Sequence, residues 1–258
     1  SLALILYLNL THFNPLWQTS QGYDDLVCFI IGSSAKLKGV KMSEVQIQNE
    51  CQRSLIDMLN TLDSLLDQFP SRKNASCRFG NIAFRDWHAQ LVQESDGMVS
   101  RLIERSETSG SGDCKTQREI LKLELVAYLK ESFGSEVRLD YGTGHELNFV
   151  IFLMILFKVG FLDLNEHAAS TILIGFERYL TLVRRIQIQY NLEPAGSHGA
   201  WSLDDHQFLC FLWGSAQMTD DGDIEPSNFP DSSFYTRAAK DNMFMSAVNH
   251  INQVKSGP

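Results

Sequence analysis

The sequence predicts an all-α protein, and two observations lead to that fold class. Apolar residues recur at steps of three and four along several stretches of the 258-residue chain, which is the period of an amphipathic helix. No stretch alternates apolar and polar residues for long enough to indicate a strand. With 44% hydrophobic and 21% charged residues, the composition is that of an ordinary globular protein.

Two helices are predicted by clear apolar patterns. In the first, apolar residues recur every three or four positions and a proline follows: Leu55, Leu59, Leu62, Leu66, Phe69 and Pro70. The second is longer and carries Ile172, Phe176, Tyr179, Val183, Ile186 and Tyr190. Further helices are expected near residues 20–37, 82–93, 117–132, 146–159, 204–213 and 240–254. Residues 149–157 are apolar throughout, which predicts a helix buried on all sides that is too short to span a bilayer.

We expect a single helical domain over residues 1–258 with two subregions, 1–104 and 117–258. Residues 105–117 (RSETSGSGDCKTQ) are small and polar and lack an apolar anchor, which predicts a mobile surface insertion. A second break is expected in the acidic, proline-containing residues 219–233. The sequence has no repeat of fixed period, which argues against an α-solenoid.

Charge and cysteine content exclude some classes of partner and site. The formal net charge of -9 at pH 7 comes without a basic stripe, which argues against a nucleic-acid partner. The cysteines are scattered without a Cys-x-x-Cys motif, which indicates a reducing compartment and not a disulfide framework or a zinc site. Residues 1–10 lack a basic leader and are too short to span a bilayer. We therefore expect no membrane partner and a cytoplasmic location, with the nucleus left open.

The stretch RLDYGTGHELNF (138–149) has two interpretations. In the first, Thr143 and Glu146 form a capping box. The threonine hydroxyl accepts an N–H of the first helical turn, and the glutamate reaches back to the N–H of Thr143. An apolar helix then follows from Leu147, and Gly142 and Gly144 only permit the turn.

In the second interpretation the same helix start binds phosphate, because its free N–H groups and positive dipole end attract anions. Arg138 can donate to two phosphate oxygens, and Asp140 or Glu146 can hold Mg²⁺ directly or through water. The stretch is not a Walker A loop, because the lysine and the long glycine spacing are absent. His145 and Glu146 do not form a zinc-protease motif, because no second histidine follows.

A second polar stretch, residues 190–217, also has two interpretations. Prolines and glycines exclude a regular helix over residues 193–201, which predicts an ordered loop that carries Ser197 and His198. Ser202 and Asp205 fit a capping box that opens a buried aromatic helix.

In the alternative, this stretch forms one wall of a site, where side chains face a cation or a ligand: Glu193, His198, Trp201, Asp204 and Asp205. Hydrolytic chemistry is poorly supported. Side chains of adjacent residues such as Ser197 and His198 rarely point at each other, and no G-x-S-x-G motif surrounds this pair. Asp204 and Asp205 would diverge by about 100° at a helix start, which argues against a glycosidase pair.

The stretch RFGNIAFRDWH (78–88) is interpreted as mainly structural, with a contribution of Arg78 or Arg85 to the cleft left open. Phe79, Phe84 and Trp87 recur at helical spacing, which predicts core positions. Arg85 and Asp86 are expected to pair on the solvent face, a contact worth less than about 1 kcal/mol.

Four stretches, in this order, resemble the phosphotyrosyl phosphatase activator family, the activators of protein phosphatase type 2A. They are RFGNIAFRDWH (78–88), YLKESFGSEVRLDYGTGHELNF (128–149), LEPAGSHGAWSLDDHQFLCFLWGSAQM (192–218) and INQVKSGP (251–258). The resemblance covers nearly the whole chain, although much of 95–120 does not match. It implies an all-α fold with core, lid and linker parts around a deep cleft.

The resemblance also implies an activity. Such a protein associates with the catalytic subunit of phosphatase 2A and promotes its active, metal-loaded form with ATP and Mg²⁺. A peptidyl-prolyl cis/trans isomerase activity on a proline-containing peptide is implied as well. Family members continue past the position of Pro258, and part of that continuation closes over the nucleotide, whereas the sequence printed here ends there.

The site residues follow from two family motifs, R-x-DYGTGHE and AGSHGxWxLDD. The first contacts nucleotide in the family, which for this sequence implies Arg138, Asp140, Gly142, Thr143, Gly144, His145 and Glu146. The second lines the same cleft, which implies Glu193, Gly196, Ser197, His198 and Trp201. Its acidic end is associated with Mg²⁺, which implies Asp204 and Asp205 as metal ligands.

Three hypotheses about the activity are open. A conventional isomerase would bind the twisted amide in a dry aromatic cleft, with Trp201 and Trp213 as its wall and Trp201 or Asp205 as catalytic candidates. A binding module or chaperone would use ATP and Mg²⁺ to order the active site of the phosphatase. The sequence favours the binding module, because no catalytic dyad emerges from the motifs. A helical interaction scaffold without a small-molecule site is the alternative, and it would leave Arg138 and Asp204 without a task.

Overall fold

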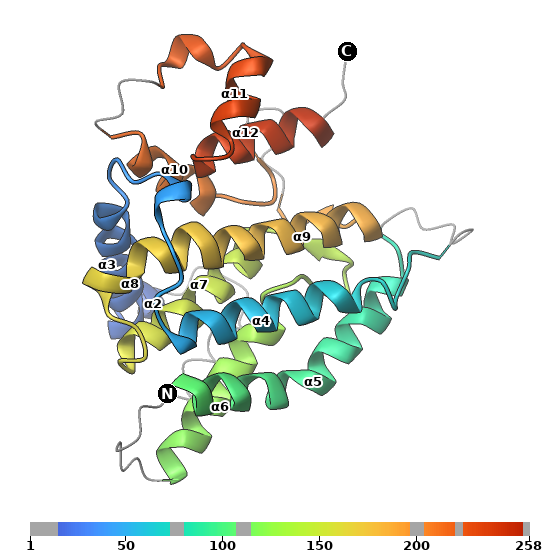
Figure 1. The fold of residues 1–258 in the computed structure, drawn as a ribbon. Helices are drawn as coiled ribbons and strands as arrows, with labels where there is room; N and C mark the ends of the chain where they lie inside the picture. The colour runs from blue at the N-terminus through green and yellow to red at the C-terminus, as the bar shows by residue number, and fades with distance from the viewer. Residues whose placement is uncertain (1–14, 73–79, 107–114, 197–203, 220–223, 255–258) are drawn as a thin grey trace.

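A computed structural model describes residues 15–72, 80–106, 115–196, 204–219 and 224–254, and within them the predicted all-α fold is confirmed (Figure 1). The first helices are α2 (Pro15–Gln18), α3 (Gln21–Lys36), α4 (Glu50–Leu65), α5 (Ala83–Ser106) and α6 (Lys115–Lys130). They are followed by α7 (Thr143–Lys158), α8 (Leu164–Ser170), α9 (Glu177–Tyr190), α10 (Leu209–Gln217), α11 (Ser232–Ala238) and α12 (Met243–Val254). Short 3₁₀ turns occupy Met42–Glu44 (η1) and Pro226–Asn228 (η4), and a π-helical turn, η2, occupies Thr171–Phe176. The strands β1 (Asp140–Tyr141) and β2 (Glu193–Pro194) form a small parallel pair.

The helices are arranged in two parts around one core. In Figure 1, α4 and α9 run side by side across the middle, with α5 and α6 below them and α10 to α12 gathered above. Contacts of α4 and α5 with α9 join the two predicted subregions, and α10 joins α3 to α12. One continuous apolar cluster extends from α3 to α12, so no separate core divides the described residues.

Helix α7 runs through the interior, as its apolar sequence predicts. All residues from Phe149 to Leu156 are buried, and Phe157 is half-buried. None of the described helices is both long enough and apolar enough to cross a bilayer.

Helices α8 and α9 form one rod from residue 164 to 190, interrupted by the π-helical turn η2. The Gln52 amide of α4 donates to the hydroxyls of Ser170 and Thr171, at 2.7 and 2.9 Å, where this turn begins. A Cβ added to Gly175 would lie 3.1 Å from Leu55, so α4 packs directly against the widened turn. Wider turns of this kind occur mostly as single turns inside α-helices.

Several predicted boundaries differ from the structure. Helix α5 extends to Ser106 instead of ending near residue 93, and α6 begins at Lys115, so the ends of the predicted insertion 105–117 are helical. Its centre, residues 107–114, lies outside the described residues. Helices α2, α8 and α11 were not predicted, because all three are short. The described cysteines, Cys28, Cys51 and Cys210, form no disulfide.

Candidate functional site

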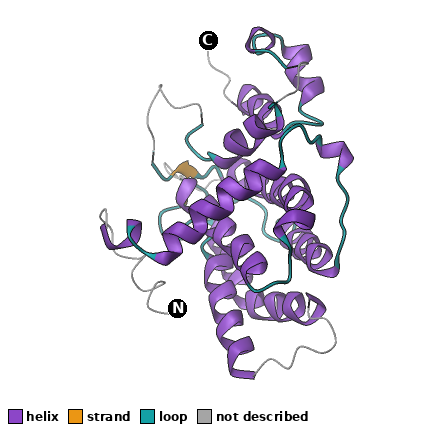
Figure 2. Ribbon diagram, turned by 90° about the vertical axis from the view of Figure 1, so that its left-hand side faces the viewer, coloured by secondary structure: helices purple, strands orange, loops and turns teal. Residues whose placement is uncertain are grey.

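The two polar stretches meet at the strand pair. Asp140 and Tyr141 of β1 pair in parallel with Glu193 and Pro194 of β2. The Glu193 N–H donates to the Leu139 carbonyl at 3.1 Å. Figure 2 shows this pair as a small patch of sheet at the edge of the helical body. The structure therefore brings residues 138–146 next to the start of the 193–208 segment.

Arg138 lies on an exposed turn in front of β1. Its side chain is 62% exposed, and its Nε donates to Asp140 Oδ2 at 2.7 Å. The hydrogen bond to Asp140 raises the pKa of the guanidinium. The turn is tight: Leu139 adopts a left-handed φ of 56°, and the Ser135 N–H donates to the Asp140 carbonyl at 2.9 Å. Arg138 is thus a fixed cation whose remaining donors belong to a side chain open to solvent.

The predicted capping box at the start of α7 is wrong. The helix begins at Thr143, its N-cap is the extended Gly142, and no side chain caps it. Thr143 and Gly144 are exposed, and a Cβ added to Gly144 would meet nothing within 4 Å. A Cβ on Gly142 would lie 3.0 Å from the Cβ of Ala195, so the close approach of β2 requires a small residue there. The first turn of α7 therefore presents open backbone to solvent.

The Glu146 carboxylate does not bind the N–H of Thr143, because it accepts hydrogen bonds from a segment far away in sequence. Its side chain is buried, with 1% of the residue exposed. Its Oε2 accepts the N–H groups of Phe208 and Leu209, at 2.9 and 3.1 Å, at the start of α10. Burial raises the pKa of Glu146 to about 7, against the opposing effect of these two hydrogen bonds. Glu146 thus caps α10 from another helix.

His145 faces the protein interior. Its Nδ1–H donates to the Glu131 carbonyl at 2.7 Å, and its Nε2 lies 3.9 Å from Asp140 Oδ1. The ring stacks on Tyr141, with centroids 5.8 Å apart. Burial lowers the pKa of His145, so the ring is held neutral beside the turn at ordinary pH.

The second predicted capping box is also wrong. Ser202 lies outside the described residues, and α10 begins at Leu209, five positions later than the predicted helix 204–213. Asp204 Oδ1 instead accepts the N–H of His206 at 2.7 Å, which makes a local turn. Burial alone would raise the pKa of Asp204, but the hydrogen bonds from His206 outweigh it and lower the pKa. Asp204 is therefore ionised at neutral pH.

The rest of this segment carries buried polar atoms without partners in the part of the chain that is described. They are Asp205 Oδ1, His206 Nε2 and both polar side-chain atoms of Gln207. Such atoms are uncommon in native proteins, where buried polar groups nearly always have a hydrogen-bond partner. No three His, Cys, Asp or Glu side chains of the described residues converge to hold a metal on their own.

Other predicted cleft residues are only partly visible. Glu193 is half-buried and Gly196 is exposed, whereas Ser197, His198 and Trp201 lie outside the described residues. Trp213, proposed as an aromatic wall, is a core residue. It has 0% exposure, its Nε1–H donates to Ser33 Oγ at 3.1 Å, and its ring packs edge-on against Phe176. That part of the isomerase hypothesis is wrong.

The stretch 78–88 supports the Arg138 turn, a role that no local pattern of the sequence requires. Arg85 donates to the Glu136 and Val137 carbonyls, at 2.9 and 3.4 Å, just before Arg138. The predicted pair of Arg85 with Asp86 is therefore wrong, and Asp86 pairs with Arg72 at 2.5 Å. The expected core role of this stretch is confirmed for the two aromatic residues that are described, whereas the third lies outside them: Phe84, Trp87 and Phe79.

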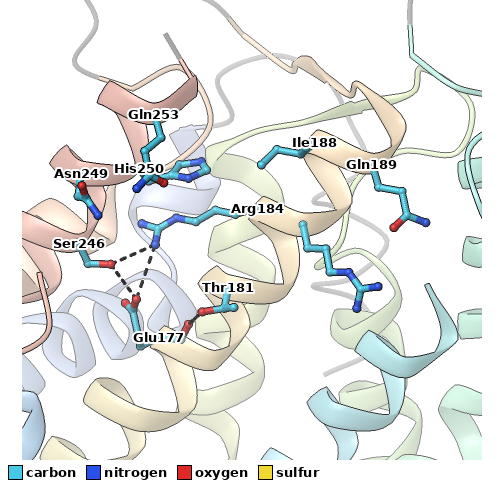
Figure 3. Close-up of a pocket in the computed structure, with 10 residues that line it drawn as sticks. Glu177, Thr181, Arg184, Ile188, Gln189, Ser246, Asn249, His250 and Gln253 are labelled. Atoms are coloured by element: carbon cyan, nitrogen blue, oxygen red, sulfur yellow. Dashed lines mark hydrogen bonds and ion pairs between the residues drawn. The ribbon is translucent and has the colours of Figure 1, made fainter. Parts of the chain in front are cut away.

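A pocket of about 660 Å³ lies between α9 and α12 (Figure 3). Most of the residues that line it are of polar types, and they include Glu177, Thr181, Arg184, Ile188, Ser246, Asn249, His250 and Gln253. Arg184 crosses from α9 toward α12, where its Nη1 donates to Ser246 Oγ at 3.2 Å and lies 3.6 Å from Glu177 Oε1. Of the predicted site residues that the structure describes, none lines this pocket. The spacing of the α9 residues, 177, 181, 184 and 188, is the one signal that could have indicated it.

Comparison with known proteins gives one consistent family. A family model described as "Phosphotyrosyl phosphate activator (PTPA) protein" matches residues 9–258. A Drosophila melanogaster protein named "Serine/threonine-protein phosphatase 2A activator" is 38% identical over 242 residues, which are 94% of this chain and 58% of that relative. A Dictyostelium discoideum protein named "Probable serine/threonine-protein phosphatase 2A activator 2" is 35% identical, with 93% of this chain and 51% of the relative covered.

A solved structure agrees in fold. The crystal structure described as "the PP2A phosphatase activator Ypa1 PTPA1" matches with a TM-score of 0.76 at 28% sequence identity. The match covers 92% of this chain and 71% of that chain. The chain thus spans between half and three fifths of the length of the two relatives named above.

Proposed function

This chain belongs to the phosphotyrosyl phosphatase activator family, and from that premise we propose that it activates the catalytic subunit of serine/threonine phosphatase 2A by binding it. We further propose that ATP and Mg²⁺ are held at the start of α7 during this activation. The observation that carries the nucleotide part is the uncapped, solvent-exposed first turn of α7 at Thr143 and Gly144.

The α7 start fits a nucleotide phosphate. Free N–H groups and the positive end of the helix dipole favour an anion at this position. The open space at Gly144 lets a phosphate approach the backbone. Arg138, whose Nε is engaged by Asp140, supplies further donors from an exposed guanidinium. In this proposal Arg138 binds the phosphate and Asp140 orients Arg138.

The acidic segment after the loop fits Mg²⁺. This ion is usually held by one or two protein carboxylates together with substrate phosphates, so the absence of a three-residue group among the described residues is compatible with it. Asp204 is ionised, and Asp205 Oδ1 is buried without a partner among the residues described. When bound, the ion would neutralise phosphate charge. Asp204 and Asp205 would contribute its protein ligands.

We favour activation by binding over isomerisation of free peptides. An isomerase wall would need Trp201, because Trp213 is enclosed in the core. Binding requires no catalytic dyad, only a bound nucleotide that completes the surface offered to the phosphatase. The proposal also differs from a scaffold without a small-molecule site, which would leave the exposed α7 start and Arg138 without a ligand.

Isothermal titration of ATP with Mg²⁺ into the wild type and into Arg138→Ala tests the nucleotide part. Saturable binding should be weakened at least tenfold in Arg138→Ala and unchanged in Arg101→Ala, an exposed arginine on α5. The second arm measures phosphatase activity after incubation of the catalytic subunit with each protein, beside isomerisation of a short proline peptide alone. Peptide isomerisation that survives Arg138→Ala, together with unchanged phosphatase activity, would refute activation by binding.

A further inference from the structure

We propose that Glu146 is a positioning residue that anchors residues 204–208 to the first turn of α7. The family resemblance implies a nucleotide-contacting role for this residue, whereas its geometry points to a different one. The part of this inference that concerns Mg²⁺ rests on the proposed function, because Asp204 lies in the anchored segment.

The anchor is a single carboxylate oxygen that receives two backbone donors. Glu146 Oε2 accepts the N–H groups of Phe208 and Leu209, which are 62 and 63 residues away in sequence. Phe208 is the N-cap of α10, and its own side chain makes no capping bond. The first N–H groups of a helix have no partner inside the helix. Glu146 therefore supplies the acceptor for the start of α10 that the Phe208 side chain cannot offer.

The anchor limits where Asp204 can lie. Three residues separate Asp204 from Phe208, and the bond from the His206 N–H to Asp204 Oδ1 folds part of that span into a turn. Gln207, next to the anchored amide, is 2% exposed. A segment this short, fixed at one end and folded at the other, has little freedom to move its carboxylate. Glu146 thus sets the position of Asp204 through the backbone.

Charge around the anchor is balanced by other elements. Asp204 and Arg184 are the two charged groups that act most on Glu146, with opposite signs. Arg184 comes from α9 and Asp204 from the segment before α10, so charges of two other elements act on the anchor. Both N–H groups reach Oε2, whereas Oε1 is buried and has no partner among the described residues. The positioning role therefore needs Oε2 alone, and a direct ligand role would have to use Oε1.

Amide hydrogen exchange and Mg²⁺–ATP titration, applied to Glu146→Gln, Glu146→Ala and Asp204→Asn, test the inference. The glutamine oxygen can still accept both N–H groups, so Glu146→Gln should keep protection at Phe208 and Leu209 within about threefold of the wild type, and affinity likewise. Glu146→Ala should lose at least tenfold in both. Asp204→Asn should lose affinity for Mg²⁺–ATP and keep the protection.

Two results would overturn the inference. Unchanged protection at Phe208 and Leu209 in Glu146→Ala would show that the carboxylate anchors nothing. Lost affinity in Glu146→Gln with full protection would show that the charge itself binds the ion, as a direct ligand does. If Glu146→Ala does not fold, Glu146→Gln still distinguishes a positioning role from a direct ligand role. If the wild type binds no Mg²⁺–ATP, the proposed function fails and the exchange experiment alone decides the anchoring.

Discussion

Replacing His250 with glutamine should make the protein more resistant to acid. His250 lines the α9–α12 pocket beside Arg184, and Figure 3 shows the ring close to that guanidinium. Burial, followed by the charge of Arg184, lowers the pKa of His250 from 6.5 to about 4. The native state therefore keeps the ring neutral at a pH where the unfolded chain would protonate it.

The sign and size of the effect follow from proton binding. Between pH 6.5 and 4 the unfolded state binds more protons at this position, so His250 costs stability as the pH falls through that window. A shift of one pKa unit corresponds to about 1.4 kcal/mol, which gives up to about 3 kcal/mol over the whole window. Because the ring is partly exposed, we expect about 2 kcal/mol. Glutamine keeps a polar side chain and does not titrate.

Urea unfolding of the wild type and His250→Gln, at pH 7 and at pH 4.5, measures this difference. The free energy of unfolding of the variant relative to the wild type should rise by about 2 kcal/mol from pH 7 to pH 4.5. Taking the difference between the two proteins removes the contribution of every other titrating group they share. A difference that stays constant with pH would refute the reasoning, because His250 would then have the same pKa in both states.

Three further predictions concern other positions. Glu146→Gln should show the opposite pH dependence, because the raised pKa of Glu146 makes the wild type lose up to about 3 kcal/mol as the pH rises from 4.5 to about 7; urea unfolding across that range checks this, and parallel curves would contradict it. Gly214→Ala should destabilise by at least about 2 kcal/mol, because the new Cβ would lie 2.1 Å from the Phe244 nitrogen; Gly97→Ala, where the nearest atom is 3.5 Å away, is the control and should be neutral or slightly stabilising. Arg85→Ala should weaken binding of ATP–Mg²⁺ several-fold by freeing the turn before Arg138, with unfolding free energy changed by less than about 1 kcal/mol; equal affinities in titration would contradict this.

Much of the fold could be predicted from the sequence, because long helices repeat their pattern. Residues 172–190 show the helical period over five turns, and the structure is helical there throughout, with a π-helical turn up to Phe176 and α9 after it. Phe84 and Trp87 were placed in the core by the same argument. These predictions need only local spacing, which the packing of α9 and α5 preserves.

The site was harder to predict, because its contacts join distant residues. Glu146 stands at the third position after Thr143, as a capping box requires, yet its carboxylate binds N–H groups more than sixty residues away. Local pattern cannot show that a stronger, buried partner competes for a side chain. Trp213 illustrates a second limit. Residues 208–213 are apolar on several faces, so the sequence does not tell which aromatic ring faces the cleft and which the core.

The π-helical turn at Thr171–Phe176 constrains how many residues the rod formed by α8 and α9 can contain. Removing one residue there would restore a regular α-helix and rotate everything after it by about 100°, since each residue of a helix turns the chain by that angle. The rotation would carry Glu193 and Pro194 away from Asp140 and Tyr141. The number of residues between Asp163 and Glu193 therefore fixes the position of β2. We expect related chains to have the same number there.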